Sequence, residues 1–174
     1  NRSLLDAGAA AVVYSVLFPE KDRFGGDAEF AESMAQVPTF LSAVATADTD
    51  RQQGWHIGVA TLGQVNENAI NYPGILPNVA PLQAAAIGTG VVNTAPEVDG
   101  LVRRVPMVIR VGESLYPALG LDVLRGLAGD PSYQVRGSET GIEAVRVPSF
   151  DTINTDAAGR VWIDCGTNFA QQPI

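Results

Sequence analysis

The hydrophobic and polar positions at the start of the chain predict alternating strands and helices. Residues 10–18 are a nearly continuous apolar run, which is typical of a strand covered on both faces. An amphipathic helix follows, with Asp27 as its N-cap and Pro38 at its end. Residues 39–45 predict a second buried strand. This order favours parallel strands joined by right-handed crossovers.

The middle of the chain predicts a long loop followed by a hairpin. Residues 67–79 contain Tyr-Pro-Gly and Leu-Pro, which interrupt regular structure, and loops of this length are often functional. Two β-rich runs, residues 90–93 and 101–111, flank Asp99 and Gly100. We therefore expect these runs to pair as an antiparallel hairpin, with Gly100 supplying a positive φ near its tip.

The last third of the chain predicts one helix and several strands. A core-facing helix stripe is expected from five apolar side chains: Tyr116, Leu119, Val123, Leu124 and Leu127. Beyond it, residues 133–136, 142–147 and 160–164 read as antiparallel strands added at a sheet edge. The chain is therefore predicted to be a single α/β domain over residues 1–174, with a mixed, partly parallel sheet flanked by helices.

Composition narrows the function classes. Hydrophobic residues make up 46% and charged residues 17% of the 174 residues, which indicates a folded domain. Eleven basic and 19 acidic residues give a formal net charge of −8, and this charge argues against nucleic acid or anionic lipid as a partner. No apolar run is long enough to span a bilayer, and the single Cys165 has no partner for an internal disulfide.

The sequence contains no recognisable catalytic or cofactor motif. His56 is the only histidine, so a histidine-rich metal site is excluded, and no nucleophile elbow is present. Residues 88–90, Gly-Thr-Gly, lack the rest of a phosphate-binding fingerprint and indicate tight packing instead. Asp22 and Asp27 lie near Gly25 and Gly26 without the spacing of a calcium loop. We predict no catalytic residue, no metal and no cofactor.

The pair Arg103 and Arg104 is the strongest candidate for a ligand contact. Neighbours in a strand point to opposite faces, so one guanidinium is expected to face inward and to need a carboxylate partner, for which Asp99 is the candidate. The arginines either brace the hairpin or contact an anionic ligand. With them we predict Asp22, Asp27 and Tyr72 as ligand-binding residues, because they lie in the loops on either side.

Several stretches of the chain resemble one family. They are residues 92–106, 116–125, 7–20 and 26–31, which occur in the family's order. Together they are similar to the CHASE2 domain, the second class of cyclase- and histidine-kinase-associated sensory extracellular domains. The chain departs from the family's pattern at Ser15, where an acidic residue is common. We also expect the family's first strand to precede Asn1 and this chain to be part of a longer protein.

The resemblance implies a periplasmic or extracytoplasmic signal-sensing domain of a bacterial inner-membrane receptor. The implied output is an adenylate or guanylate cyclase, with a histidine kinase or serine/threonine kinase as the alternative. An unknown small-molecule or protein signal, membrane segments outside this chain and a homodimer are the expected partners. Two other classes stay open, a small hydrolase or transferase with an unrecognised site, in which His56 would take part, and a structural dimerisation module.

Overall fold

The central feature of the fold is strand β2 (Thr39–Thr46), which pairs with three other strands. The structure is a computed structural model that describes residues 2–49, 55, 58–65 and 68–164. β1 (Val12–Tyr14) and β6 (Gly88–Val91) run parallel to β2, and β5 (Gly74–Leu76) pairs with it antiparallel. The mixed, partly parallel sheet that the sequence predicted is confirmed.

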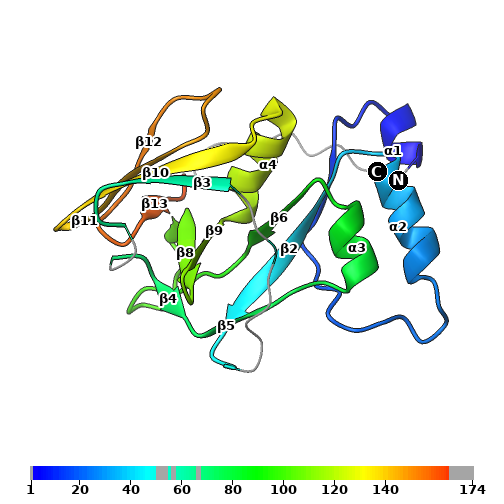
Figure 1. Cartoon of the computed structure of the whole chain (residues 1–174), viewed down its shortest axis with the longest axis horizontal. Helices are drawn as coiled ribbons and strands as arrows, with labels where there is room; N and C mark the ends of the chain where they lie inside the picture. The colour runs from blue at the N-terminus through cyan, green and yellow to red at the C-terminus, as the bar shows by residue number, and fades with distance from the viewer. Residues whose placement is uncertain (1, 50–54, 56–57, 66–67, 165–174) are drawn as a thin grey trace.

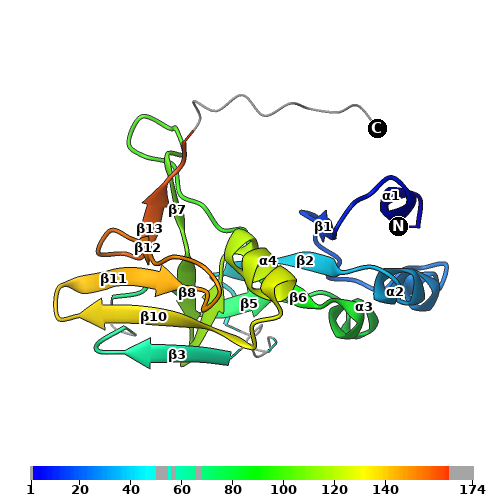
Figure 2. The same cartoon turned by 90° about the horizontal axis from the view of Figure 1, so that it is seen from above.

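Helices cover both faces of this central sheet (Figures 1 and 2). α2 (Asp27–Ala35) and α3 (Ala80–Ala85) lie on one face, where Met34 and Leu82 pack with Leu41 of β2. α4 (Leu119–Ala128) packs against β6 and β2 on the other face. A short helix, α1 (Arg2–Asp6), precedes β1. The three-layer arrangement follows from buried apolar residues on both sides of β2.

A second group of strands lies beside the central sheet (Figure 1). Its largest sheet has the order β12-β11-β10-β3, in which β3 is parallel to β10 and the other pairs are antiparallel. Two smaller sheets, β4-β8-β9 and β13-β7, accompany it. The strands are β3 (Gly58–Leu62), β4 (Asn71–Tyr72), β7 (Arg104–Pro106), β8 (Val108–Val111), β9 (Ser114–Pro117), β10 (Ser132–Ser138), β11 (Gly141–Arg146), β12 (Ile153–Asn154) and β13 (Arg160–Trp162).

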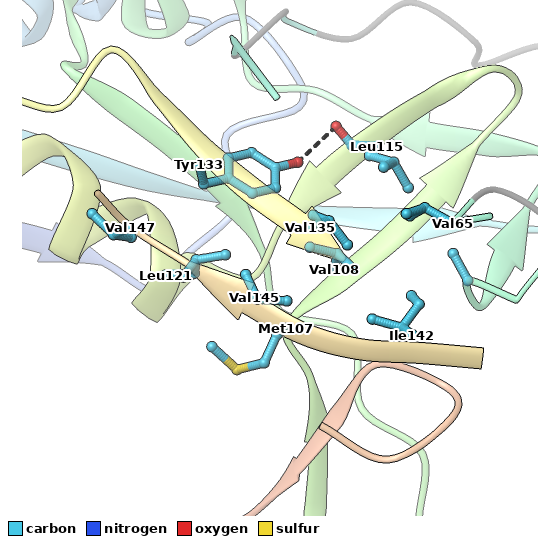
Figure 3. Packing of buried hydrophobic residues seen from close by; sticks show 11 residues of the cluster. Val65, Met107, Val108, Leu115, Leu121, Tyr133, Val135, Ile142, Val145 and Val147 are labelled. Atoms are coloured by element: carbon cyan, nitrogen blue, oxygen red, sulfur yellow. Dashed lines mark hydrogen bonds between the residues drawn. The ribbon is translucent and has the colours of Figure 1, made fainter. Parts of the chain in front are cut away.

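The largest buried cluster joins these strands to helix α4 (Figure 3). Leu121 of α4 lies among side chains from β8, β9, β10 and β11. Tyr133 is fully buried there, and its hydroxyl donates a hydrogen bond of 3.1 Å to the carbonyl of Leu115. The molecule thus has two halves, the central sheet with its helices and the second group of strands. Helix α4 packs on both halves, since it also contacts β6 and β2 of the central sheet.

The predicted hairpin is the main correction. Residues 90–93 do not pair with 101–111: β6 pairs with β2, and β7 pairs with β13. The glycine of the predicted tip, Gly100, does have a positive φ of 84°. The next antiparallel hairpin along the chain is formed by β8 and β9, which pair around Gly112.

Three further expectations about elements were wrong in detail. Only Val12–Tyr14 of residues 10–18 form a strand, and Val13 is 45% exposed because β1 is an edge strand. Residues 67–79 include β4 and β5 rather than a loop without regular structure. The C-terminal strands make antiparallel pairs, as expected, but they do not extend the central sheet: β10 and β11 form a sheet with β3, and β13 pairs with β7.

Two predictions about helices also need correction. Asp27 is the first residue of α2 and not its N-cap, which is Gly26, and its carboxylate accepts a hydrogen bond from the Asp22 amide. In α4 the buried side chains are Leu119, Leu121 and Asp122, whereas Leu124 and Leu127 are exposed. The buried face of α4 includes the polar Asp122, so the apolar positions alone did not define that face.

Candidate functional site

A buried ion pair in α4 lies at the contact between the two halves of the molecule. Asp122 is fully buried and its Oδ1 accepts a hydrogen bond of 2.5 Å from Nε of Arg125, whose side chain is only 12% exposed. The same guanidinium donates to the carbonyls of Asp130, at 2.9 Å, and Ile87, at 3.3 Å. Arg125 therefore joins the end of α4 to the residue before β6.

Burial raises the pKa of Asp122 above its ordinary value. The hydrogen bond and charge of Arg125 oppose this rise, as does a weak interaction with the backbone of Thr89. A buried ion pair of this kind contributes little net stability, because desolvation offsets the attraction between the charges. The ion pair instead fixes the position of the Arg125 side chain.

A polar pocket of about 310 Å³ opens beside this ion pair. It lies where the end of α3, the start of β6 and the end of α4 meet the segments that enter β3 and β10; Figure 2 shows β6 between α3 and α4. Its walls are formed by nine residues: Trp55, Gly58, Gln83, Ala86, Ile87, Gly88, Thr89, Arg125 and Pro131. Gly88 has no room for a side chain, because a Cβ there would collide with Asp122 Oδ2 and with Phe40 on the side of the packed core.

Two residues of the pocket wall carry buried polar atoms without a partner. Among the described residues, four buried side-chain atoms have no hydrogen-bond partner: Trp55 Nε1, Gln83 Oε1, Asp122 Oδ2 and Arg110 Nε. The first two belong to residues of the pocket wall, and the third belongs to the ion-pair partner of Arg125. Buried polar groups are nearly always satisfied in folded proteins. The two orphaned atoms of the wall, Trp55 Nε1 and Gln83 Oε1, therefore indicate a place where a bound molecule supplies the missing partners.

A second hollow, of about 330 Å³, lies over β3, β10 and β11. Its charged side chains already have partners: Arg136 pairs with Glu143 at 3.0 Å, and Arg146 donates to the carbonyls of Pro148 and Phe150. Because these groups are satisfied, the hollow shows no unmet requirement for a ligand. The pocket beside Arg125 is the stronger candidate site.

The two arginines singled out in the sequence have different roles. Arg103 forms an exposed pair with Asp99 at 2.6 Å. The sequence predicted Asp99 as the partner of the inward-facing arginine, which is wrong because the more buried arginine is Arg104, and its partners are Glu97 and Asp156. Arg104 is half-buried and clamps Glu97 with two hydrogen bonds of 2.8 and 2.9 Å. Its third contact is Asp156 at 2.9 Å.

The Arg104 cluster connects β7 to the chain around β13. Asp156 also accepts hydrogen bonds from Arg160, and the Arg104 guanidinium lies 5.2 Å from the ring centroid of Trp162. The hydrogen bond from Arg104 holds the pKa of Glu97 below its ordinary value. Burial alone would raise the pKa of Asp156, but the hydrogen bonds and charge of Arg160 outweigh it and lower that pKa. These contacts brace the β7–β13 pair.

The structure does not bring the predicted ligand-binding residues together. Asp22 and Asp27 accept hydrogen bonds from backbone amides of the loop before α2. Asp22 accepts from the Phe24 and Gly26 amides, and Asp27 accepts from the Asp22 amide. Tyr72 lies in β4 and packs against a separate apolar cluster. Figures 1 and 2 place α2 and β13 on opposite sides of β2, so the acidic loop and the arginines belong to different regions. Their role in binding stays a prediction.

The sequence did not predict this pocket, because the polar groups of its wall come from separate segments of the chain. The one available signal was Asp122, a carboxylate within an apolar helix and three residues before an arginine. His56 and Cys165 lie outside the described residues. Among the residues described, no group of three or more histidine, cysteine, aspartate or glutamate side chains could hold a metal ion. The described helices are also too short or too polar to cross a membrane.

Comparison with known proteins identifies the family. The model of the CHASE2 domain matches residues 2–174, almost the whole chain. No curated protein and no solved structure matches significantly. The match covers both halves of the fold described above, including the ion pair, the pocket and the Arg104 cluster. The chain therefore belongs to the CHASE2 domain family, the extracellular sensory domains of signalling receptors.

Proposed function

We propose that the chain is the periplasmic signal-sensing portion of a bacterial inner-membrane receptor with an adenylate or guanylate cyclase output. The observation that carries this proposal is the family match over residues 2–174. Cyclases are the output that we favour because they are prominent among the outputs of this family. A histidine or serine/threonine kinase output is the alternative of the same class. We also propose that the receptor is a homodimer.

The pocket beside Arg125 supports a sensing mechanism. Its wall combines residues of the central sheet and its helices with Gly58 and Pro131, which lead into the second sheet. A molecule that contacts both groups would favour one relative arrangement of the two halves. Binding shifts such an equilibrium only by the difference in affinity between the two arrangements. The site is therefore well placed to convert binding into a change of shape.

The output can be tested on membranes from cells that express the full-length protein. We expect these membranes to form cyclic AMP from ATP or cyclic GMP from GTP. Substitution Gln83→Leu in the pocket wall should change this rate at least about twofold, a coupling at the low end of known allosteric effects. Gln134→Leu, in the other hollow, is the matched control and should leave the rate unchanged.

Two results would count against the proposed output. Phosphorylation of the receptor or of a partner protein, without cyclic nucleotide formation, would favour the kinase alternative. Cyclic nucleotide formation that is found only in the soluble fraction would contradict the membrane receptor itself.

A further inference from the structure

We propose that the pocket beside Arg125 binds a small uncharged polyol of about the size of a monosaccharide. This inference rests on the proposed sensing function and names the class of its ligand. The argument uses the charge of the site, the hydrogen-bonding groups that lack partners and the size of the pocket.

The charge of the site favours an uncharged ligand. Arg125 is the only charged residue in the pocket wall as described, and Asp122 neutralises it through a hydrogen bond of 2.5 Å. The guanidinium is further occupied by the carbonyls of Asp130 and Ile87. A charged ligand would therefore lose its hydration without gaining a free counter-charge, which is a large cost in a partly buried site.

The orphaned atoms favour hydroxyl groups. Gln83 Oε1 is an acceptor that needs a donor, whereas Trp55 Nε1 is a donor that needs an acceptor, and both residues line the pocket. Gln83 has its orientation fixed, because its Nε2 donates a hydrogen bond of 2.7 Å to Thr89 Oγ1. A hydroxyl group both donates and accepts, so a molecule with several hydroxyls can satisfy both atoms.

The size of the pocket agrees with this class. Water takes about 30 Å³ per molecule in the liquid, so a volume of about 310 Å³ holds on the order of ten non-hydrogen atoms. The indole of Trp55, held edge-on against Tyr116 with ring centroids 5.0 Å apart, supplies an apolar wall beside its N–H group. Aromatic side chains that offer an apolar body and a polar tip suit ligands whose faces are apolar and whose edges carry hydroxyls.

Calorimetric titration of the purified chain tests the proposal, with D-glucose, D-galactose, D-ribose and myo-inositol as the neutral probes. We expect at least one of them to bind at millimolar concentration or below. Trp55→Phe removes the indole N–H and Gln83→Leu removes the acceptor, so each should weaken binding about five- to tenfold. Trp162→Phe and Gln134→Leu are matched controls outside the pocket and should bind as the unmodified chain does.

D-glucosamine and D-glucuronate test the preference for an uncharged ligand, and we expect each to bind at least about tenfold more weakly than its neutral counterpart. Thermal unfolding of every variant verifies that it is folded. The proposal is overturned if no neutral probe binds, if a charged probe binds more tightly, or if both pocket variants bind as well as the controls. Binding is measured on this chain alone, so its failure is distinguishable from failure of the membrane assay.

Discussion

At the scale of single residues, Tyr133 shows how one hydrogen bond joins two sheets. Its ring is fully buried in the largest cluster, and its hydroxyl reaches the carbonyl of Leu115 on the neighbouring sheet (Figure 3). Burial raises the pKa of Tyr133 well above its ordinary value, and the nearby charge of Asp122 adds to the effect. The hydroxyl therefore stays protonated and acts as a permanent donor.

Replacing Tyr133 by Phe removes this donor and leaves the Leu115 carbonyl without it. We expect the free energy of unfolding to fall by about 1 kcal/mol, the net contribution of one hydrogen bond. Urea unfolding followed by circular dichroism measures the change. Tyr72→Phe, at a partly exposed position, is the control and should change the stability by less than about 0.5 kcal/mol. Equal stability of Tyr133→Phe and the unmodified chain would show that the bond contributes nothing.

Single residues also mark how far the sequence could predict the site. The closeness of Asp99 to the arginine pair follows from their spacing, since residues around one tight turn must lie close, although Asp99 pairs with the exposed Arg103 and not with the inward-facing arginine. The wall of the pocket beside Arg125 does not, because Gln83 and Trp55 reach it only after three segments have packed around β6. Contacts between residues close in sequence were predictable, and those that depend on tertiary packing were not.

At the scale of elements, the approach of α4 to β6 depends on glycine. A Cβ at Gly90 would lie 2.3 Å from the Leu119 Cα and 2.5 Å from its amide nitrogen, which are backbone atoms that cannot rotate away. The sequence indicated tight packing at residues 88–90, and the structure confirms it. The helix can cover β6 only because no side chain separates them.

Gly90→Ala should therefore destabilise the chain by about 1–3 kcal/mol, the usual range for overpacking. Gly120→Ala is the matched control in the same helix, since an added Cβ at Gly120 in α4 would point into open space. Alanine is the better helix former, so this control should stabilise by up to about 1 kcal/mol. Urea unfolding midpoints of the two variants measure both effects, and the same sign for both would contradict the packing argument.

The predicted pairing of residues 90–93 with 101–111 was wrong for a physical reason. Adjacent β-rich runs around an Asp-Gly turn satisfy every local requirement of a hairpin. In the structure β6 instead pairs with β2, which buries all four of its residues in the central sheet. β7 pairs with β13, which lies more than 50 residues later in the chain. Local turn chemistry was outweighed by the burial available in a sheet covered on both faces.

The β7–β13 pair should be sensitive to acid. The pKa values of Glu97 and Asp156 lie below their ordinary values of 4.5 and 3.8, so their stabilising contribution is complete above those values. It is lost as the pH falls through the lowered pKa values. Asp122 has a raised pKa and the opposite sign, because its contribution is largest at low pH and decreases as the pH rises.

We therefore expect the urea midpoint to fall between about pH 6 and about pH 3, and to fall less in Arg104→Met, which lacks the partner of Glu97. The comparison of these two pH dependences is the measurement. Arg103→Met, which removes only an exposed pair, is the control and should behave more like the unmodified chain. Identical pH dependences in all three proteins would show that the Arg104 cluster does not brace the strands.

At the scale of the whole molecule, two sheet systems share one helix. α4 contributes Leu121 to the larger core and contacts β6 and β2 of the central sheet, while its Arg125 lies in the pocket at their meeting point. The alternation of β and α elements was sufficient to predict the mixed sheet and the helices on both faces. The division of the strands among separate sheets was not predictable, because it depends on pairings between distant parts of the chain.

The extracytoplasmic position of this chain, on which its sensing role depends, can be tested directly by chemical labelling of intact cells. Leu62→Cys places a thiol at a side chain that is 68% exposed on β3, and Cys165→Ser removes the native thiol of this chain. In cells that express the full-length receptor, a membrane-impermeant maleimide should label the introduced thiol without lysis. Labelling that occurs only after the inner membrane has been broken would contradict the account.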